Sequence, residues 1–380
     1  MFFLLIQKNL PWLEGHRLGF LRVFTFPTFQ ATAAILLSFI LSVAFGPRVI
    51  AWLRRQKVGD LPSFDQVDID RLMKDKAGTP TMGGILIIGA IFVTTVLLAD
   101  LRNFYVQMGL LCLVLLGGVG AVDDWLKLTA KRTGRGRDGL SPAEKLLFQI
   151  GLSVILCAFT FHLGKNMPES HTLYFPFFKT WEVELSMSVF VLIGTIVLTG
   201  SSNAVNLTDG LDGLASGTMS IVSFAFVILT LIIGTLPWAS YLLLPYIKAS
   251  DQMAILAGAM MGACLGFLWF NCHPASVFMG DTGSLALGGL IGYIAIVIRQ
   301  ELTLFLVGGI FVVEAISVLI QRYYFKYTRL KFGEGRRFFL VAPLHHHFQK
   351  KGWTEQQVVV RFWLIGAILA AMALATVKLR

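Results

Sequence analysis

Residues 104–122 read FYVQMGLLCLVLLGGVGAV, a run of 19 residues without a charge, and Asp123 and Asp124 follow it directly. About 20 apolar residues in an α-helix cross a hydrocarbon core of about 30 Å. The run therefore predicts a transmembrane helix that ends in two carboxylates. An acid at the end of an apolar helix is costly unless it is hydrated, paired or bound to a cation, so these residues draw attention as a functional site.

The apolar character extends over the whole chain. Its 380 residues are 56% hydrophobic and only 14% charged, and the mean hydropathy is +0.72. These values exclude a water-soluble globular protein. The net charge of +10 must concentrate in short loops, which indicates contact with membrane lipid or an anionic substrate and no nucleic acid partner.

Ten apolar stretches predict an all-α integral membrane protein with about ten transmembrane helices, forming a single polytopic domain over residues 1–380. Residues 1–23 are expected to form an interfacial N-terminal arm, and Leu236–Ile247 is too short to cross the bilayer. The predicted spans are Phe24–Phe45, Met82–Ala99, Phe104–Val122, Leu146–Leu163, Leu185–Leu198, Leu214–Ile233, Met253–Phe270, Ser284–Ile298, Leu302–Ile320 and Val358–Val377.

The distribution of Lys and Arg residues predicts the orientation. Five loops on one side hold 21 of them, and the segments on the other side hold 10. The positive-inside rule places the first set in the cytoplasm and both termini on the periplasmic side. Because none of these loops exceeds 40 residues, an active site must be assembled from loops and helix ends at the cytoplasmic face. The cytoplasmic loops are about 46–81, 123–145, 199–213, 271–283 and 321–357.

Five of the aspartates on this predicted cytoplasmic side follow the third, fifth and seventh predicted spans: Asp123, Asp124, Asp209, Asp212 and Asp281. The loops that carry the last three contain no Lys or Arg, so their partners are basic residues of neighbouring loops or a divalent cation. Mg²⁺ suits a few carboxylates together with phosphate oxygens. Asp123 alone is equally explained by an i,i+4 ion pair with Lys127, whereas adjacent carboxylates raise the pKa of one of them and favour a general base.

Asn203, Asn206, Asp209 and Asp212 recur at every third position, and such amides and carboxylates suit the edge of a nucleobase or sugar. The alternative is a capped turn, and for Asp212 alone a cap on the following helix is the favoured interpretation. A helix cap is also the alternative for Asp281.

Three histidines, His345, His346 and His347, lie in a basic loop. Consecutive residues cannot share one helical face, which argues against a metal site built from this run alone. Binding of phosphate or pyrophosphate, or proton transfer near neutral pH, is expected instead. Glu314 lies inside a predicted span, where a functional role competes with a structural hydrogen bond. The four cysteines are expected to be small apolar residues without disulfides.

Five segments in chain order resemble the phospho-N-acetylmuramoyl-pentapeptide transferases, within the polyprenyl-phosphate N-acetylhexosamine-1-phosphate transferase superfamily. The resemblance spans nearly the whole chain and implies transfer of phospho-MurNAc-pentapeptide from its UDP carrier to undecaprenyl phosphate, with Mg²⁺ and release of UMP, by a homodimer in the bacterial inner membrane. The segments are Lys76–Gly84, Asp123-Asp124-x-x-Lys127, Asn203–Ala215, Phe278–Ser284 and Ala342–Phe348.

The resemblance also implies roles for individual residues. Asp281 would bind Mg²⁺, and Asp123 with Asp124 would deprotonate or orient the lipid phosphate. The uridine pocket would contain Lys76, Gly210, Leu211, Asp212, Asn271 and Phe278, with Thr81 among the substrate-binding residues. The sugar and pyrophosphate region would contain Lys127, Asn203, Asn206, Asp209, His345, His346 and His347.

Two departures from the family pattern and two alternatives accompany this interpretation. Residues 59–74 are acidic and lack the Gly-Gln and His usual in the family, and Gln349 stands where Glu is frequent. The related UDP-GlcNAc:polyprenyl-phosphate GlcNAc-1-phosphate transferases share the aspartates and the topology, although the Ala342–Phe348 and Gly78–Gly84 segments favour the muramoyl branch. A transporter would instead place its acids near the membrane midplane.

Overall fold

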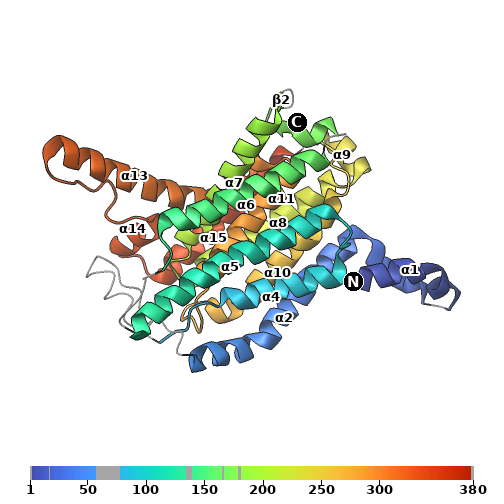
Figure 1. The fold of residues 1–380 in the computed structure, drawn as a ribbon, viewed down its shortest axis with the longest axis horizontal. Helices are drawn as coiled ribbons and strands as arrows, with labels where there is room; N and C mark the ends of the chain where they lie inside the picture. The colour runs from blue at the N-terminus through green and yellow to red at the C-terminus, as the bar shows by residue number, and fades with distance from the viewer. Residues whose placement is uncertain are drawn as a thin grey trace.

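The computed structural model describes residues 2–16, 18–56, 78–133, 139–164, 167–178 and 181–377, which form a bundle of long helices (Figure 1). The α-helices are α1 (Phe2–Gly15), α2 (Pro27–Arg55), α4 (Gly84–Leu98), α5 (Phe104–Thr133), α6 (Pro142–Leu163), α7 (Met187–Thr208), α8 (Leu214–Ile233), α9 (Leu236–Leu242), α10 (Met253–Asn271), α11 (Gly280–Val297), α12 (Glu301–Val307), α13 (Gly309–Phe332), α14 (Leu344–Lys350) and α15 (Glu355–Thr376). Short 3₁₀ helices are η1 (Gly19–Thr25), η3 (Pro168–His171) and η4 (Ser250–Gln252). Strands β1 (Thr172–Tyr174) and β2 (Glu182–Glu184) form an antiparallel pair with Leu173 opposite Val183.

Each of the ten predicted spans corresponds to a helix or a helix pair, which confirms an all-α multi-pass membrane protein. Within the described ranges, eight helices are long and apolar enough to cross a bilayer, and the bent pair α12–α13 makes a ninth. Helix α4 matches the remaining predicted span and is a shorter apolar helix. The N-terminal arm forms α1 and η1, and α9 has only seven residues. The side of the membrane on which the termini lie stays a prediction.

Helices α5, α7 and α13 extend into predicted cytoplasmic loops, and one predicted span is bent. Helix α5 continues to Thr133, so Asp123 and Asp124 lie within a helix rather than on a loop after it. The span predicted over residues 302–320 is not straight, because α12 and α13 meet at an angle of 85°. The break falls at Gly308 and Gly309, and paired small residues are a common site of sharp helix kinks.

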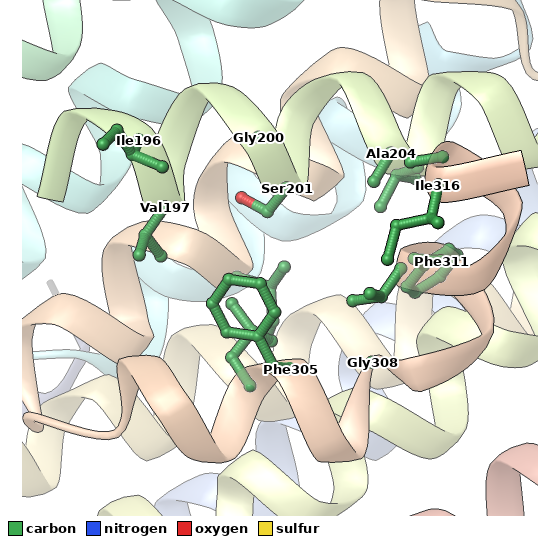
Figure 2. A pocket seen from close by; sticks show the side chains of 14 residues that line it. Ile196, Val197, Gly200, Ser201, Ala204, Phe305, Gly308, Phe311 and Ile316 are labelled. Atoms are coloured by element: carbon green, nitrogen blue, oxygen red, sulfur yellow. The ribbon is translucent and has the colours of Figure 1, made fainter. Parts of the chain in front are cut away.

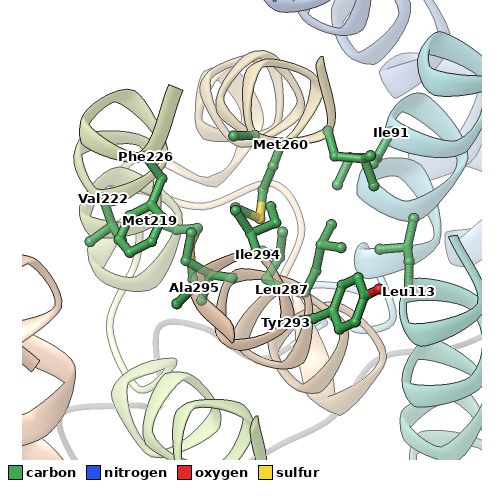
Figure 3. Packing of buried hydrophobic residues seen from close by; sticks show 14 of the residues in the cluster. Ile91, Leu113, Met219, Val222, Phe226, Met260, Leu287, Tyr293, Ile294 and Ala295 are labelled. Atoms are coloured by element: carbon green, nitrogen blue, oxygen red, sulfur yellow. The ribbon is translucent and has the colours of Figure 1, made fainter. Parts of the chain in front are cut away.

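Helix α11 is the centre of the bundle. It is the most buried of the spans, and Tyr293, Leu287 and Ile294 from α11 pack with residues of the surrounding helices (Figure 3). On α10, the glycines Gly258, Gly262 and Gly266 face the backbone of α2 so closely that a Cβ atom would collide there. Small residues at intervals of four let transmembrane helices approach closely. The packed bundle thus fixes the ends of α5, α7 and α11 relative to one another, which positions the polar residues described next.

Candidate active site

A cluster of three carboxylates joins α5 to the first turn of α11. One carboxylate oxygen from each of Asp123, Asp124 and Asp281 lies within 4.8 Å of the others. Asp123 is fully buried and Asp124 almost so, although both belong to a residue type that is rarely buried without partners. The structure therefore brings together the acids that the sequence placed on two separate loops.

Two lysines neutralise this cluster. The Lys127 ammonium lies 2.6 Å from Oδ2 of Asp123 and 3.4 Å from Oδ2 of Asp281. The Lys145 ammonium lies 2.7 Å from Oδ2 of Asp123 and 2.6 Å from Oδ2 of Asp281. The predicted i,i+4 pair between Asp123 and Lys127 is confirmed, but it is one part of a network that reaches α6 and α11. The backbone N–H of Leu140 also donates to Oδ1 of Asp123 at 2.7 Å.

Asp124 holds the start of α11. Its Oδ2 accepts hydrogen bonds from the Thr282 hydroxyl at 2.6 Å and the Thr282 N–H at 2.9 Å, and its Oδ1 accepts from the Asp281 N–H at 3.2 Å. A carboxylate at the N-terminus of a helix satisfies free N–H groups and interacts favourably with the helix dipole. Asp281 itself does not cap α11, since the helix begins at Gly280 and Met279 is its N-cap. Gly280 has φ +74°, and a side chain there would collide with Oδ2 of Asp124.

The end of α7 reaches the same cluster. Asn206 donates through its amide to Oδ1 of Asp281 at 2.8 Å and to the Ser284 hydroxyl at 2.9 Å. Asp209 follows the helix, and its pKa is raised well above the ordinary value by burial and by the charges of Asp281 and Asp124. Asn203, one turn earlier, bonds instead to Gln149 on α6 at 2.7 Å. Asn206 and Asp209 thus adjoin the carboxylates, whereas the Asn203 amide joins two helices.

A second polar group surrounds Asp212. Its Oδ2 accepts from the Ala275 N–H at 3.1 Å and lies 3.1 Å from Nδ1 of His273. The Asp212 N–H donates to Oε1 of Glu355 on α15 at 2.8 Å. The cap expected for Asp212 is wrong, because Gly213 is the N-cap of α8 and the Asp212 side chain turns to the 273–275 segment. The Asp212 carboxylate thus accepts a backbone N–H from a distant segment.

Asn271 and its neighbours connect the segments that surround Asp212. The Asn271 amide accepts from the Gly213 N–H at 3.0 Å and donates to the Val277 carbonyl at 2.9 Å. The Phe278 backbone bonds to Pro80 and Gly83 in the segment before α4. Thr81 lies beside Gly280, because a Cβ atom added at Gly280 would contact the Thr81 hydroxyl. These contacts bring the 78–84, 203–215 and 278–284 segments to one end of the bundle. Lys76 and residues 59–74 lie outside the described residues.

The histidine run lies beside the 210–212 turn. His345 is buried, its N–H donates to Oε1 of Glu314 at 3.1 Å, and its Nδ1 lies 3.2 Å from Oε2 of the same residue. Its Nε2 has no hydrogen-bond partner among the described residues and points at Gly210, where a Cβ atom would collide with it. The bond from the His345 N–H is thus the structural hydrogen bond that was the alternative to a functional role for Glu314.

Leu211 packs in a small apolar cluster with residues of α15.

The two following histidines make local contacts. His346 Nδ1 lies 2.8 Å from Oε1 of Gln349, so Gln at this position retains an acceptor. His347 Nδ1 accepts from the Leu340 N–H at 3.2 Å. Burial and the charge of Lys351 lower the pKa of His347, so its imidazole is predominantly neutral at pH 7. At neutral pH it can donate one N–H to a phosphate, but it does not bring a full positive charge.

The sequence interpretation missed His273 and Glu355 beside Asp212, and it missed Lys145. Lys145 lies in the first turn of α6, directly after the capping box formed by Ser141 and Glu144. A cation there opposes the helix dipole, which favours negative charge at the N-terminus. The sequence did contain a signal for Lys145. A lysine in this unfavourable position needs an acidic partner, and carboxylates were expected on the same side of the membrane.

Carboxylates grouped with lysines at one end of an apolar helix bundle suit a multi-pass membrane enzyme that binds phosphate groups. Residues 106–299 match the model of glycosyl transferase family 4. Residues 76–88 match signature 1 of the phospho-N-acetylmuramoyl-pentapeptide transferases. The chain belongs to glycosyl transferase family 4 and carries the signature of its phospho-N-acetylmuramoyl-pentapeptide-transferring members. The resemblance seen in the sequence is therefore confirmed, and the protein is a phosphosugar transferase.

Proposed function

We propose that this protein transfers phospho-MurNAc-pentapeptide from UDP-MurNAc-pentapeptide to undecaprenyl phosphate, forming lipid I and UMP for peptidoglycan synthesis. The observation that carries the proposal is the cluster of Asp123, Asp124 and Asp281 with Lys127 and Lys145, in a chain with the muramoyl signature. The bacterial inner membrane and a homodimer belong to the same proposal.

The donors in this cluster fit Mg²⁺. Carboxylate oxygens are the hard ligands that Mg²⁺ prefers, and the ion commonly completes its shell with water and substrate phosphates. The Lys145 ammonium contacts both Asp123 and Asp281, which supports the proposal that a cation is stabilised between these carboxylates. Asp281 would hold the ion. Bound there, Mg²⁺ would neutralise charge on the diphosphate.

The protein's own residues would divide the remaining work. A phosphate oxygen of the acceptor lipid forms a bond to the sugar-bearing phosphorus while the bond from that phosphorus to UMP breaks. Such transfers depend on alignment and charge neutralisation more than on covalent chemistry by the protein. Lys127 and Lys145 would stabilise the phosphate charge, Asp123 would deprotonate or orient the acceptor, and Asp124 would hold Asp281 in place through Thr282.

The nucleotide would bind on the side of Asp212. Gly210, Leu211, Asp212, Asn271 and Phe278 belong to the segments that meet there, and we propose that Lys76 joins them. Nε2 of His345 has no hydrogen-bond partner within the described part of the chain and faces Gly210, which supports a role for this nitrogen toward the sugar or diphosphate. Asn203, Asn206, Asp209, His346 and His347 complete the proposed substrate region.

An apolar groove in the membrane region suits the acceptor lipid. The groove has a cavity volume of about 220 Å³ and lies between α7, α12 and α13. Figure 2 shows Phe305 and Ile316 facing Val197, Ser201 and Ala204 of α7 across this space. The groove follows α7 to Val205, next to the Asn206 that bonds to Asp281. A polyprenyl chain in the groove would therefore bring its phosphate to the carboxylate cluster.

The test is UMP release by the purified protein. Given UDP-MurNAc-pentapeptide, undecaprenyl phosphate and Mg²⁺, the protein should release UMP and form a lipid-linked product. UDP-GlcNAc in place of the muramoyl substrate should give little UMP. The reverse preference would assign the protein to the GlcNAc-1-phosphate branch and contradict the proposal.

A further inference from the structure

The second half of α13 is a largely exposed helix outside the proposed active site. Figure 1 shows α13 extending away from the bundle, after a bend of 85° from α12. Between Gln321 and Leu340 only Thr328 is fully buried. This segment contains six Arg or Lys residues and a single acid, Glu334. None of the six forms an ion pair with an acid among the described residues.

One face of α13 is apolar and points away from the protein. Its members follow the three- and four-residue spacing of a helical stripe: Ile316, Leu319, Tyr323, Tyr327 and Leu330. Each is exposed, and Leu330 reaches 79%. The opposite face contains the buried residues Glu314, Ser317 and Thr328. In water such a stripe would be unfavourable, so its natural surroundings are lipid acyl chains.

Cations flank this apolar stripe. Arg322, Lys326 and Arg329 are exposed beside it on the helix. Further along, Lys331 lies over the rings of Tyr327 and Phe332, and Arg336 lies over the ring of Phe332. Basic side chains with apolar and aromatic neighbours characterise helices in the membrane interface, where the stems lie against acyl chains and the charges reach the phosphates.

We propose that the exposed face of α13, from Ile316 to Leu330 with Arg322, Lys326 and Arg329, is a binding surface for anionic phospholipids of the cytoplasmic leaflet. The apolar stripe would lie in the acyl region and the three cations would contact headgroup phosphates. Charge complementarity selects this occupant, because five net positive charges lie between residues 321 and 340 and attract an anionic surface. Ile316 also lines the acceptor groove, so the surface is continuous with a lipid-facing part of the molecule.

The experiment places a fluorescent reporter on this face of the full-length protein. In a Cys272→Ser background, Leu330→Cys is labelled with bimane, since the other three cysteines are buried. The protein is reconstituted in phosphatidylcholine bilayers that contain brominated phosphatidylglycerol or, at the same mole fraction, brominated phosphatidylcholine. Enrichment of anionic lipid at α13 predicts quenching by phosphatidylglycerol about twofold above that by phosphatidylcholine, and high salt should reduce the ratio.

Matched variants distinguish a local surface from general charge. Arg322→Gln/Lys326→Gln/Arg329→Gln should lower the quenching ratio to nearly one, and replacing the two arginines by lysine should preserve it. Arg48→Gln/Arg54→Gln/Arg55→Gln removes three exposed cations from α2 and should leave the ratio unchanged. A reporter at Ile368 of α15, 60% exposed, should show no preference.

Three outcomes would overturn the proposal. The first is an absence of quenching by either lipid at position 330, which would place α13 outside the bilayer. The second is an equal effect of the α2 and α13 variants, which would indicate net charge alone. The third is an unchanged ratio in the α13 variant, which would favour a protein partner for this face.

Discussion

The carboxylates of Asp123 and Asp281, 158 positions apart in the chain, share the ammonium group of Lys145, at 2.7 and 2.6 Å. The C-terminal half of α5 and the first turn of α11 are thereby joined through a residue of α6. Removing the shared cation would leave two nearly buried carboxylates with Lys127 as their remaining basic partner among the residues that the structure describes. Such a loss is costly, because a buried charge without its partner keeps its full desolvation penalty.

Lys145→Met should therefore lower kcat by about 100-fold or more, the magnitude typical of removing one charge-stabilising donor from an active site. Lys145→Arg should recover part of the activity because it retains the charge. The measurement is steady-state UMP release, with circular dichroism to verify the helical content. Normal kcat in the methionine variant would show that the bridge is structural only.

Binding of Mg²⁺ should stabilise the folded protein. A ligand at about 100 times its Kd adds about 2.7 kcal/mol to the free energy of unfolding, which thermal unfolding monitored by tryptophan fluorescence would detect. Asp281→Asn should abolish this shift, since it removes the proposed principal ligand. Asp212→Asn is the matched control, because Asp212, His273 and Glu355 form a separate cluster. A Mg²⁺ shift that depends on Asp212 and not on Asp281 would relocate the ion.

Glu355 is expected to position the nucleotide pocket through the backbone of Asp212. Glu355→Ala leaves the buried Asp212 N–H without its acceptor, at a cost of about 1–3 kcal/mol. The KM for the UDP substrate should rise about tenfold with kcat less affected, since about 1.4 kcal/mol corresponds to a factor of ten. Glu355→Gln retains an acceptor oxygen and should restore most of the affinity. Equal KM values in both variants and the wild type would contradict this role.

The pH dependence of stability should report on His347. Its pKa in the folded protein is lower than the ordinary value of 6.5, so the unfolded chain binds the proton more readily. This contribution to stability is complete above the unfolded pKa and is lost as pH falls through 6.5 toward the lowered value. Between about pH 7.5 and about pH 5.5, the Tm of His347→Gln should therefore fall less than that of the wild type.

Lys351→Gln serves as the partner experiment for His347. Removing this cation should move the pKa of His347 back toward its ordinary value. The Tm at the higher pH and the Tm at the lower pH should then differ less than they do in the wild type. A steeper loss of Tm in either variant would show that other groups dominate this pH range.

Much of the fold could be predicted from the sequence because lipid imposes a simple rule. Each crossing needs a long apolar helix, and all ten predicted stretches correspond to helices. The bend between α12 and α13 could not be located in this way, since hydropathy measures apolar length and not direction. The length of α5 was also underestimated, because its last turns carry charges that are stabilised by α6 and α11.

The sequence predicted the acidic residues of the candidate site but not most of the contacts that they make. The spacing between Asp123 and Lys127 is local and gave a correct pair. The Lys145 bridge and the link from Glu355 to Asp212 join residues far apart in the chain, so no periodicity indicates them. Asp212 was assigned a local cap because turn chemistry is visible in sequence, whereas the donors in the 273–275 segment become neighbours only when the helices pack.

The most direct test of the central claim compares aspartates inside and outside the carboxylate cluster. Asp123→Asn and Asp281→Asn should each reduce UMP release from UDP-MurNAc-pentapeptide by at least about 100-fold. Asp100→Asn and Asp251→Asn, which change acids outside the cluster, should stay within about twofold of the wild type. Full turnover by both cluster variants would contradict the assignment of this cluster as the site of phosphosugar transfer.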